Sequence, residues 1–292
     1  MTESLIRSLR QNLADGGLEA SILVRDLQTG AELGIDPDVQ LPSASLVKIP
    51  LALATLNRIH HHELDGSQPV DIAPGRITAP GPTGLSRFRH PARIAIDDLV
   101  YLSTCLSDGT AADALFALTS PAYVTELLHT WGLEGISVRH PLRDLTDTPA
   151  DRLTEPALAH HLAIDAASNI PQLDPDRASS GSARAYTNLL EALWTPSAIP
   201  APVAASVRTL MSHNLHRQRL TPDFRSDATT WSSKTGTLLN LRHEIGVATH
   251  PDGSSYAVAV LTRSTVPAAT QPAADALMST TARTLHDHLR QH

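Results

Sequence analysis

The chain contains almost no lysine. Of its 23 basic residues 21 are arginine, and only Lys48 and Lys234 carry an amine. A lysine amine can lose its proton near neutral pH, whereas an arginine guanidinium cannot. We therefore expect both lysines to do what only an amine can do. The segments around these two residues are the first places to search for chemistry.

Three other features are scarce, and each excludes a class of protein. With one cysteine, Cys105, the chain cannot form an internal disulfide, so packing alone must stabilise the fold. No apolar run approaches the roughly 20 residues that span a bilayer. A net charge of -7 leaves no basic stripe for phosphates, which argues against nucleic acid and membrane partners. We expect a small-molecule substrate.

The N-terminus predicts a helix rather than a targeting segment. Residues 3–14 alternate charged and apolar side chains at helical spacing, without the uninterrupted apolar core of a signal peptide. We therefore expect a cytoplasmic protein. A secreted protein whose leader had been removed would show the same pattern.

Strand patterns occur at both ends of the chain, and helical patterns lie between them. This arrangement predicts one domain, residues 1–292, of the α/β (α+β) class, in which the terminal segments form an antiparallel sheet with flanking helices. Residues 1–50 and 226–292 form the α/β part, and residues 51–225 form an all-helical subdomain. A cleft between the two parts is the expected ligand site. Helices are expected at residues 3–14, 45–64, 92–106, 110–119, 121–131, 154–167, 183–194 and 272–289.

Ser45 lies three positions before Lys48 at the predicted start of a helix. Residues i and i+3 share one face of a helix, so the Ser45 hydroxyl can reach the Lys48 amine. The positive potential of a helix N-terminus and burial among apolar neighbours both disfavour the ammonium form. A neutral Lys48 can then take the proton from Ser45 as the hydroxyl attacks a carbonyl. Alone, this pair is a weak signal, because serine is common in the chain.

The second lysine strengthens the interpretation. Lys234 begins a Lys-Thr-Gly triplet directly before the C-terminal strands, and Ser107 begins a Ser-Asp-Gly turn between two helical runs. Ser-x-x-Lys, Ser-Asp-x and Lys-Thr-Gly in this order are the motifs of serine β-lactamases and penicillin-binding proteins. The chain resembles class A β-lactamases from about Leu9 to its C-terminus.

The resemblance implies a role for each motif residue. Ser45 would be the nucleophile and Lys48 its base, and Ser107 would relay a proton to the leaving group. A charged Lys234 would strengthen that relay and attract a substrate carboxylate. The backbone N–H groups of Ser45 and Thr237 would form the oxyanion hole. Substrate contacts are expected from Gly109, Thr235, Gly236, Thr237 and Arg242, although an exposed strand-end charge is the plainer reading of Arg242.

Two departures from the family pattern concern substrate binding and turnover. Gly109 replaces the usual asparagine of Ser-Asp-Asn, which removes a polar partner for an acylamino group. No Glu-x-x-Leu-Asn pattern supplies the deacylating glutamate, whose register falls near Arg143. Asp144 is the nearest carboxylate and the candidate for deacylation, with Asp147 and Glu155 further away. We therefore expect slow turnover of penicillins.

Other functions remain open at this point. The chain fits a serine acyl hydrolase with a β-lactam, amide or ester substrate, or an esterase of bacterial secondary metabolism. A D,D-peptidase and a β-lactam-binding protein that stays acylated are the further alternatives. The 15 histidines complete no H-E-x-x-H pattern, and no phosphate loop or dinucleotide fingerprint occurs. We expect no metal and no cofactor.

Overall fold

The computed structural model of the chain describes residues 2–73, 83–145, 170–225, 228–265 and 271–291. Its centre is a five-stranded antiparallel sheet with the strand order β2-β1-β10-β9-β8. The strands are β1 (Leu18–Asp26), β2 (Glu32–Ile35), β8 (Thr230–Leu238), β9 (Leu241–Thr249) and β10 (Ser255–Ser264). The predicted sheet built from the two ends of the chain is confirmed, and Leu18 of β1 lies opposite Ser264 of β10.

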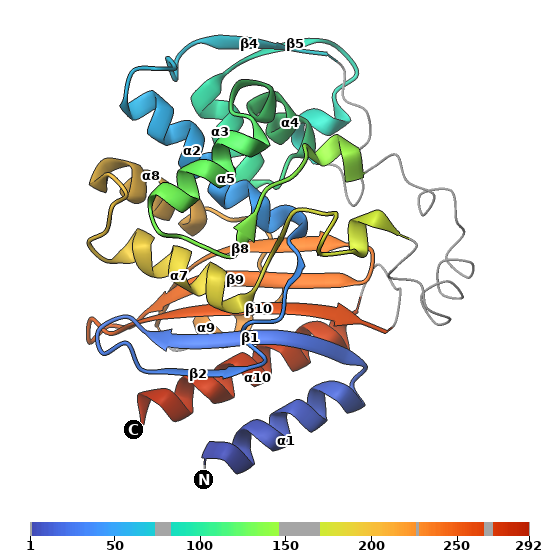
Figure 1. Cartoon of the computed structure of the whole chain (residues 1–292), viewed down its shortest axis with the longest axis vertical. Coiled ribbons are helices and arrows are strands. Elements are labelled where there is room, and N and C mark those ends of the chain that lie inside the picture. The colour runs from blue at the N-terminus through green and yellow to red at the C-terminus, as the bar shows by residue number, and fades with distance from the viewer. Residues whose placement is uncertain (1, 74–82, 146–169, 226–227, 266–270, 292) are drawn as a thin grey trace.

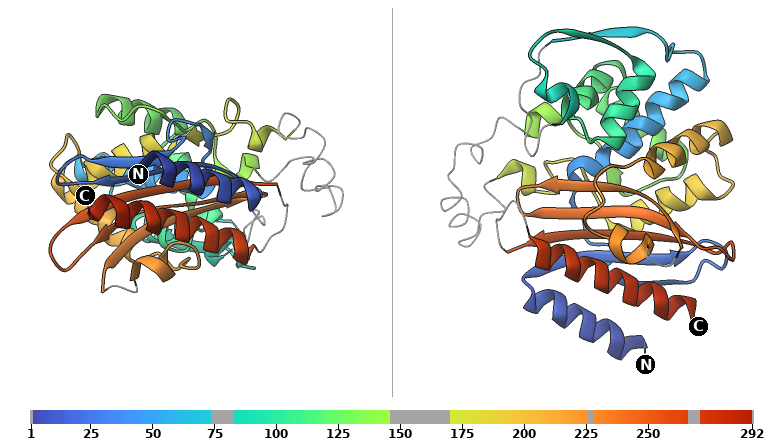
Figure 2. Two further views of the ribbon diagram at one scale, coloured as in Figure 1. Left: turned by 90° about the horizontal axis from the view of Figure 1, so that it is seen from below. Right: turned by 180° about the vertical axis from the view of Figure 1, so that it is seen from behind.

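Helices cover both faces of this sheet (Figures 1 and 2). The first helix, α1 (Thr2–Asp15), and the last, α10 (Pro272–Arg290), lie on one face. Successive side chains of a strand point to opposite faces, so Ile22 packs with the α1 and α10 side while Leu23 packs with the other helices. Both faces are therefore apolar, which explains the nearly continuous apolar runs in the strands.

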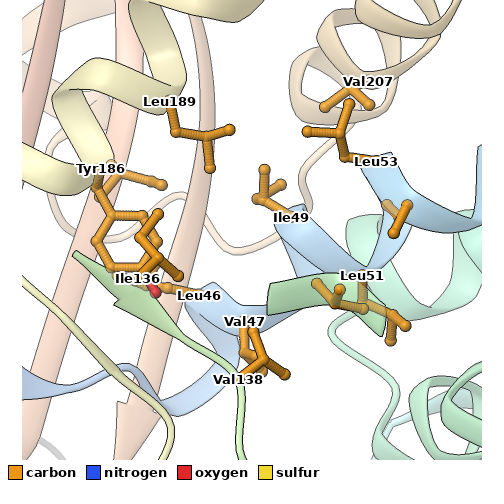
Figure 3. Packing of buried hydrophobic residues seen from close by; sticks show 14 of the residues in the cluster. Leu46, Val47, Ile49, Leu51, Leu53, Ile136, Val138, Tyr186, Leu189 and Val207 are labelled. Carbon is orange, nitrogen blue, oxygen red and sulfur yellow. The ribbon is translucent and has the colours of Figure 1, made fainter. Parts of the chain in front are cut away.

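The second face carries the helical part of the molecule. Its core gathers apolar side chains from α2 and α8, with Ile49 and Leu53 near Val207 (Figure 3). The elements are α2 (Lys48–His60), α3 (Ile96–Cys105), α4 (Gly109–Leu118), α5 (Pro121–Thr130), α7 (Ala183–Trp194), α8 (Ala201–Ser212) and α9 (Thr221–Arg225). The division into subdomains at residues 50 and 225 stays a prediction. The helix expected at residues 154–167 lies outside the described residues.

The sequence analysis placed the start and end of the second helix wrongly. Ser45 belongs to a 3-10 turn, η1 (Ala44–Val47), and α2 begins only at Lys48. This start puts Pro50 in the first turn, where the N–H that proline lacks is least needed. The helix ends at His60 rather than near residue 64, because His62 adopts a left-handed backbone with φ of 59°.

The helix expected at residues 92–106 is also partly wrong. Residues Ala92–Ala95 form the strand β5, which pairs with β4 (Pro69–Ile72), and the helix starts at Ile96. Pairing with a distant strand overrides local helical preference here. Further short strands missed by the sequence analysis are β3 (Leu41–Pro42), β6 (Ile136–Ser137) and β7 (Ser180–Gly181).

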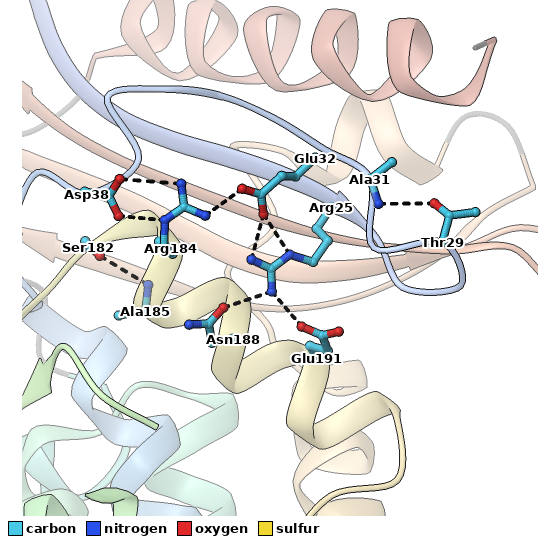
Figure 4. A network of polar contacts seen from close by, with 10 residues as sticks. All are labelled: Arg25, Thr29, Ala31, Glu32, Asp38, Ser182, Arg184, Ala185, Asn188 and Glu191. Carbon is cyan, nitrogen blue, oxygen red and sulfur yellow. Dashed lines mark hydrogen bonds and ion pairs between the residues drawn. The ribbon is translucent and has the colours of Figure 1, made fainter. Parts of the chain in front are cut away.

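An ion-pair network fastens α7 to the edge of the sheet (Figure 4). Arg25 of β1 donates to Glu32 of β2 and to Glu191 of α7. Arg184 of α7 bridges Glu32 and Asp38, so two arginines share one carboxylate. Along the described part of the chain, we find no helix with the length and apolarity needed to cross a bilayer.

Candidate active site

Ser45 lies on the short turn that connects β3 to α2. Ala44 before it has a left-handed φ of 46°, an unusual backbone for a residue with a side chain. The buried imidazole of His243 holds this turn from β9. Its Nδ1 accepts the Thr262 N–H, so its Nε2–H donates to the Pro42 carbonyl at 2.9 Å. Burial lowers the pKa of His243 to about 4, which keeps the ring neutral.

Gly236 lets the Lys-Thr-Gly strand lie against this turn. A Cβ at this position would lie 3.1 Å from the Ser43 carbonyl oxygen and 3.1 Å from Cγ of Leu46. Both distances are too close for a comfortable contact. The absence of a side chain therefore allows β8 and the Ser45 turn to approach each other.

Lys48 joins two hydroxyl groups that come from distant parts of the chain. Its Nζ lies 3.2 Å from Oγ of Ser45 and 3.2 Å from Oγ of Ser107, and it donates to the Ser107 carbonyl at 2.6 Å. A neutral amine has two N–H donors and one lone pair. It can satisfy the carbonyl and one hydroxyl as a donor and still accept the proton of Ser45.

Lys48 is 1% exposed, so its ammonium form lacks hydration. Burial lowers its pKa to about 7, against the opposing effect of the carboxylates of Asp108 and Asp113. A substantial fraction of Lys48 is therefore uncharged at neutral pH. This is the protonation state that a general base requires.

Lys234 approaches the same Ser107 hydroxyl from the sheet. Its Nζ donates to Oγ of Ser107 at 3.0 Å and to the Thr235 carbonyl at 2.7 Å. Burial, with the neighbouring charges of Lys48 and Arg219, lowers its pKa well below the usual lysine range. The expectation that Lys234 simply remains charged is therefore weakened, because two buried amines share one hydroxyl.

The turn that carries Ser107 is strained and tightly braced. Ser107 has a left-handed φ of 58°. The buried carboxylate of Asp108 accepts the N–H groups of Thr110 and Ala111 and caps α4, and it also binds the Leu85 N–H and the Ser86 hydroxyl. This confirms the expectation that Asp108 braces its turn, and the bracing directs the Ser107 hydroxyl toward both lysines.

Arg242 differs from the expected exposed strand-end charge. It is 2% exposed, and it donates to the carbonyls of Leu239 and Leu241. The guanidinium that reaches the Lys-Thr-Gly strand is Arg219, which donates to Oγ1 of Thr237 at 2.7 Å and to the Gly236 carbonyl at 3.2 Å. Arg219 was missed because nothing distinguishes it in sequence from the other 20 arginines.

The two departures from the family pattern occupy different places. Gly109 is the first residue of α4 and is buried. The backbone of Asp144 belongs to the 3-10 turn η3 (Leu142–Leu145), whereas its side chain lies outside the described residues. Asp147 and Glu155 also lie outside them. A carboxylate that the sequence analysis did not select, Asp113 of α4, binds the backbone of this turn.

The hydroxyls and the amines of the cluster differ in exposure. Ser45, Ser107 and Thr237 are half-buried, whereas both lysines are fully buried. A ligand can therefore contact the hydroxyls while the amines act from behind them. Within the described ranges, we find no group of three or more histidine, cysteine, aspartate or glutamate residues placed to hold a metal ion.

A mixed sheet-and-helix fold with a serine between two buried lysines defines the class of β-lactamase-like serine hydrolases. A family model described as "Beta-lactamase enzyme family" matches residues 4–289. The chain belongs to this family, which confirms the resemblance drawn from the motifs.

Individual relatives agree with this assignment. The chain is 59% identical over 308 residues to the β-lactamase regulatory protein BlaB of Streptomyces cacaoi, with 99% of each chain covered. Among solved structures it is similar to PBP-A, with a TM-score of 0.79, 18% identity and coverage of 99% of this chain and 97% of that one. It is also similar to the TLA-3 extended-spectrum β-lactamase, with a TM-score of 0.78, 17% identity and 99% coverage of both chains.

Proposed function

We propose that the chain is a serine acyl hydrolase that forms an ester on Ser45 with a β-lactam, amide or ester and releases it slowly. The observation that supports this most directly is the position of Lys48, whose Nζ lies 3.2 Å from each of the Ser45 and Ser107 hydroxyls. One amine can therefore take a proton at one hydroxyl and return it through the other. Both hydroxyls are accessible to a ligand.

Acylation would proceed by proton transfer along this cluster. Neutral Lys48 accepts the Ser45 proton while Oγ attacks the carbonyl carbon. The N–H groups of Ser45 and Thr237 stabilise the oxyanion, each by about 2.7–4 kcal/mol in comparable sites. When the C–N or C–O bond breaks, Ser107 passes its proton to the leaving atom and regains one from Lys48. Arg219, through Thr237, orients the donor that meets a substrate carboxylate.

Slow release follows from two sequence features. The chain has no Glu-x-x-Leu-Asn pattern to place a base for the hydrolytic water. Gly109 cannot supply the side-chain amide that would hold an acylamino group. The ester would therefore persist, since hydrolysis of the ester needs an oriented water.

A second candidate function is regulatory binding without turnover. It is favoured by the 59% identical relative, which is named a β-lactamase regulatory protein. In this role, the acylated state of the protein would itself be the signal. A mutant of PBP-A, similar in fold with a TM-score of 0.77 and 18% identity, has been solved as an acyl-enzyme complex with penicillin G.

Intact mass spectrometry over time tests both candidates. After mixing with benzylpenicillin, we expect the protein to gain the mass of the antibiotic and to lose it slowly, whereas Ser45→Ala should gain nothing. A permanent adduct supports the regulatory candidate. No adduct would direct the search to p-nitrophenyl esters. If these esters also leave Ser45 unmodified, acyl transfer on Ser45 is wrong.

A further inference from the structure

Asp113 is a partly buried carboxylate on α4 that the proposed steps do not use. Its Oδ1 accepts the Leu142 N–H at 2.6 Å, and its Oδ2 accepts the Arg143 N–H at 2.9 Å. The two oxygens therefore hold the turn η3 against α4. An ionised carboxylate is needed for both contacts, because a protonated oxygen becomes a donor facing another donor.

Asp113 also interacts electrostatically with Lys48. Burial raises the pKa of Asp113 to about 6, while the Leu142 and Arg143 N–H groups and the charges of Arg143 and Lys48 oppose this rise. The negative charge of Asp113 in turn favours the ammonium form of Lys48. These two groups titrate close to each other and close to neutral pH, so each depends on the state of the other.

The other carboxylate that acts on Lys48 has a different environment. Asp108 is fully buried and accepts four hydrogen bonds, three from backbone N–H groups and one from the Ser86 hydroxyl. Those donors bind its charged form. Asp113 has two such donors and is less buried. The carboxylate suited to change its charge in the working pH range of Lys48 is therefore Asp113.

We propose that Asp113 is a positioning residue that controls the protonation of Lys48 and fixes the turn Leu142–Leu145 to α4. This inference rests on the proposed acylation of Ser45. Ionised Asp113 stabilises the ammonium of Lys48, which shifts the onset of acylation to higher pH. The same charge orders the turn, so the base and the turn respond to one titration.

The pH dependence of the acylation rate separates this role from a purely structural one. Asp113→Asn keeps the size and one acceptor but removes the charge, so the midpoint of the rate profile should fall by about 0.5–1 pH unit. Asp113→Glu keeps the charge and should keep the midpoint even if the rate itself changes. Asp15→Asn, an exposed position on α1, is the matched control and should change neither.

The outcomes distinguish the inference from the function on which it rests. Absence of any adduct in the unaltered protein contradicts the proposed function. Normal acylation with an unshifted midpoint in Asp113→Asn contradicts only the role of Asp113. A uniform loss of rate at every pH would also overturn it, because that result reflects structure alone.

A second measurement on the unaltered protein keeps the inference testable if Asp113→Asn does not fold. Amide protection of Leu142 and Arg143, corrected for intrinsic exchange, should fall as the pH drops below about 6. The Ala185 N–H, accepted by the hydroxyl of Ser182, serves as the reference because its acceptor does not titrate. Equal protection of Leu142 and Arg143 at pH 5 and pH 7 would contradict the inference.

Discussion

Two buried polar clusters on opposite faces of the sheet differ in how their hydrogen bonds are completed. In the cluster of Ser45, Lys48, Ser107 and Lys234, two amines converge on one hydroxyl, and the hydroxyls reach solvent. The second cluster, beneath α10, joins two buried histidines, with 2.8 Å between Nε2 of each. The first can exchange protons with a ligand, whereas the second is closed.

The histidine cluster admits one arrangement of protons. Arg290 can only donate, so Nδ1 of His250 accepts and its Nε2–H donates to Nε2 of His286. Nδ1–H of His286 then faces Asp287 at 2.9 Å. Every ring nitrogen has a partner, and an added proton would place two donors face to face. The comparison suggests that unsatisfied capacity, rather than burial of polar groups, distinguishes the reactive cluster.

The largest expected effect is at Lys48. Lys48→Arg keeps a positive charge but cannot supply a neutral amine, so the acylation rate should fall about 10²–10⁴-fold. Stopped-flow measurement with nitrocefin at pH 7 checks this. The matched control is His286→Phe, which alters the closed cluster and should acylate at the rate of the unaltered protein. Equal rates for all three proteins would erase the distinction between the clusters.

The histidine cluster should instead govern acid stability. Burial is the main cause that lowers the pKa of both His250 and His286 below 6.5. The unfolded chain therefore binds more protons at mildly acidic pH, and the free energy of unfolding should decrease as the pH falls below about 6.5. Urea unfolding between pH 5 and 7 measures this loss.

His286→Phe sharpens this prediction, because the ring packs against Phe224 and Tyr256 and phenylalanine retains that packing. The variant leaves the His250 N–H without its acceptor, which should cost about 1–3 kcal/mol at pH 7. Its dependence on pH should be flatter than that of the unaltered protein. His60→Gln, at an exposed position, should retain the full dependence. A steeper dependence in His286→Phe would be inconsistent with the closed chain.

The smallest effect is expected in the exposed network at α7. Asp38 is 69% exposed and pairs with Arg184, which keeps Glu32 as a second partner. Asp38→Asn should therefore change the free energy of unfolding by about 0–1 kcal/mol. Thermal unfolding at low and high salt would measure this. A loss above 2 kcal/mol would mean that this surface network resembles the buried clusters.

The strongest predictions from sequence concerned the residues with unusual chemistry. Ser45, Lys48 and Lys234 could be selected because lysine is scarce and each lies in a motif, and the structure brings them together with Ser107. Their catalytic roles stay predictions. The antiparallel sheet could be predicted because apolar alternation and turn residues mark its strands.

The residues that support the site could not be selected in the same way. Asp113, Arg219 and His243 belong to residue types that are common in this chain, and their contacts depend on how distant elements pack. The strand at Ala92–Ala95 was missed because its partner lies more than 20 positions away. Local patterns carry no information about such long-range pairs.

The central claim is that Lys48 is largely uncharged near neutral pH, and the scarcity of lysine allows a direct test. Protein labelled with ¹³C-lysine has only two Cε signals to follow by NMR during a pH titration, and Lys48→Arg assigns them. We predict that the Lys48 signal titrates with a midpoint of about 7. A midpoint near 10.4, the value of an exposed lysine, would contradict the account.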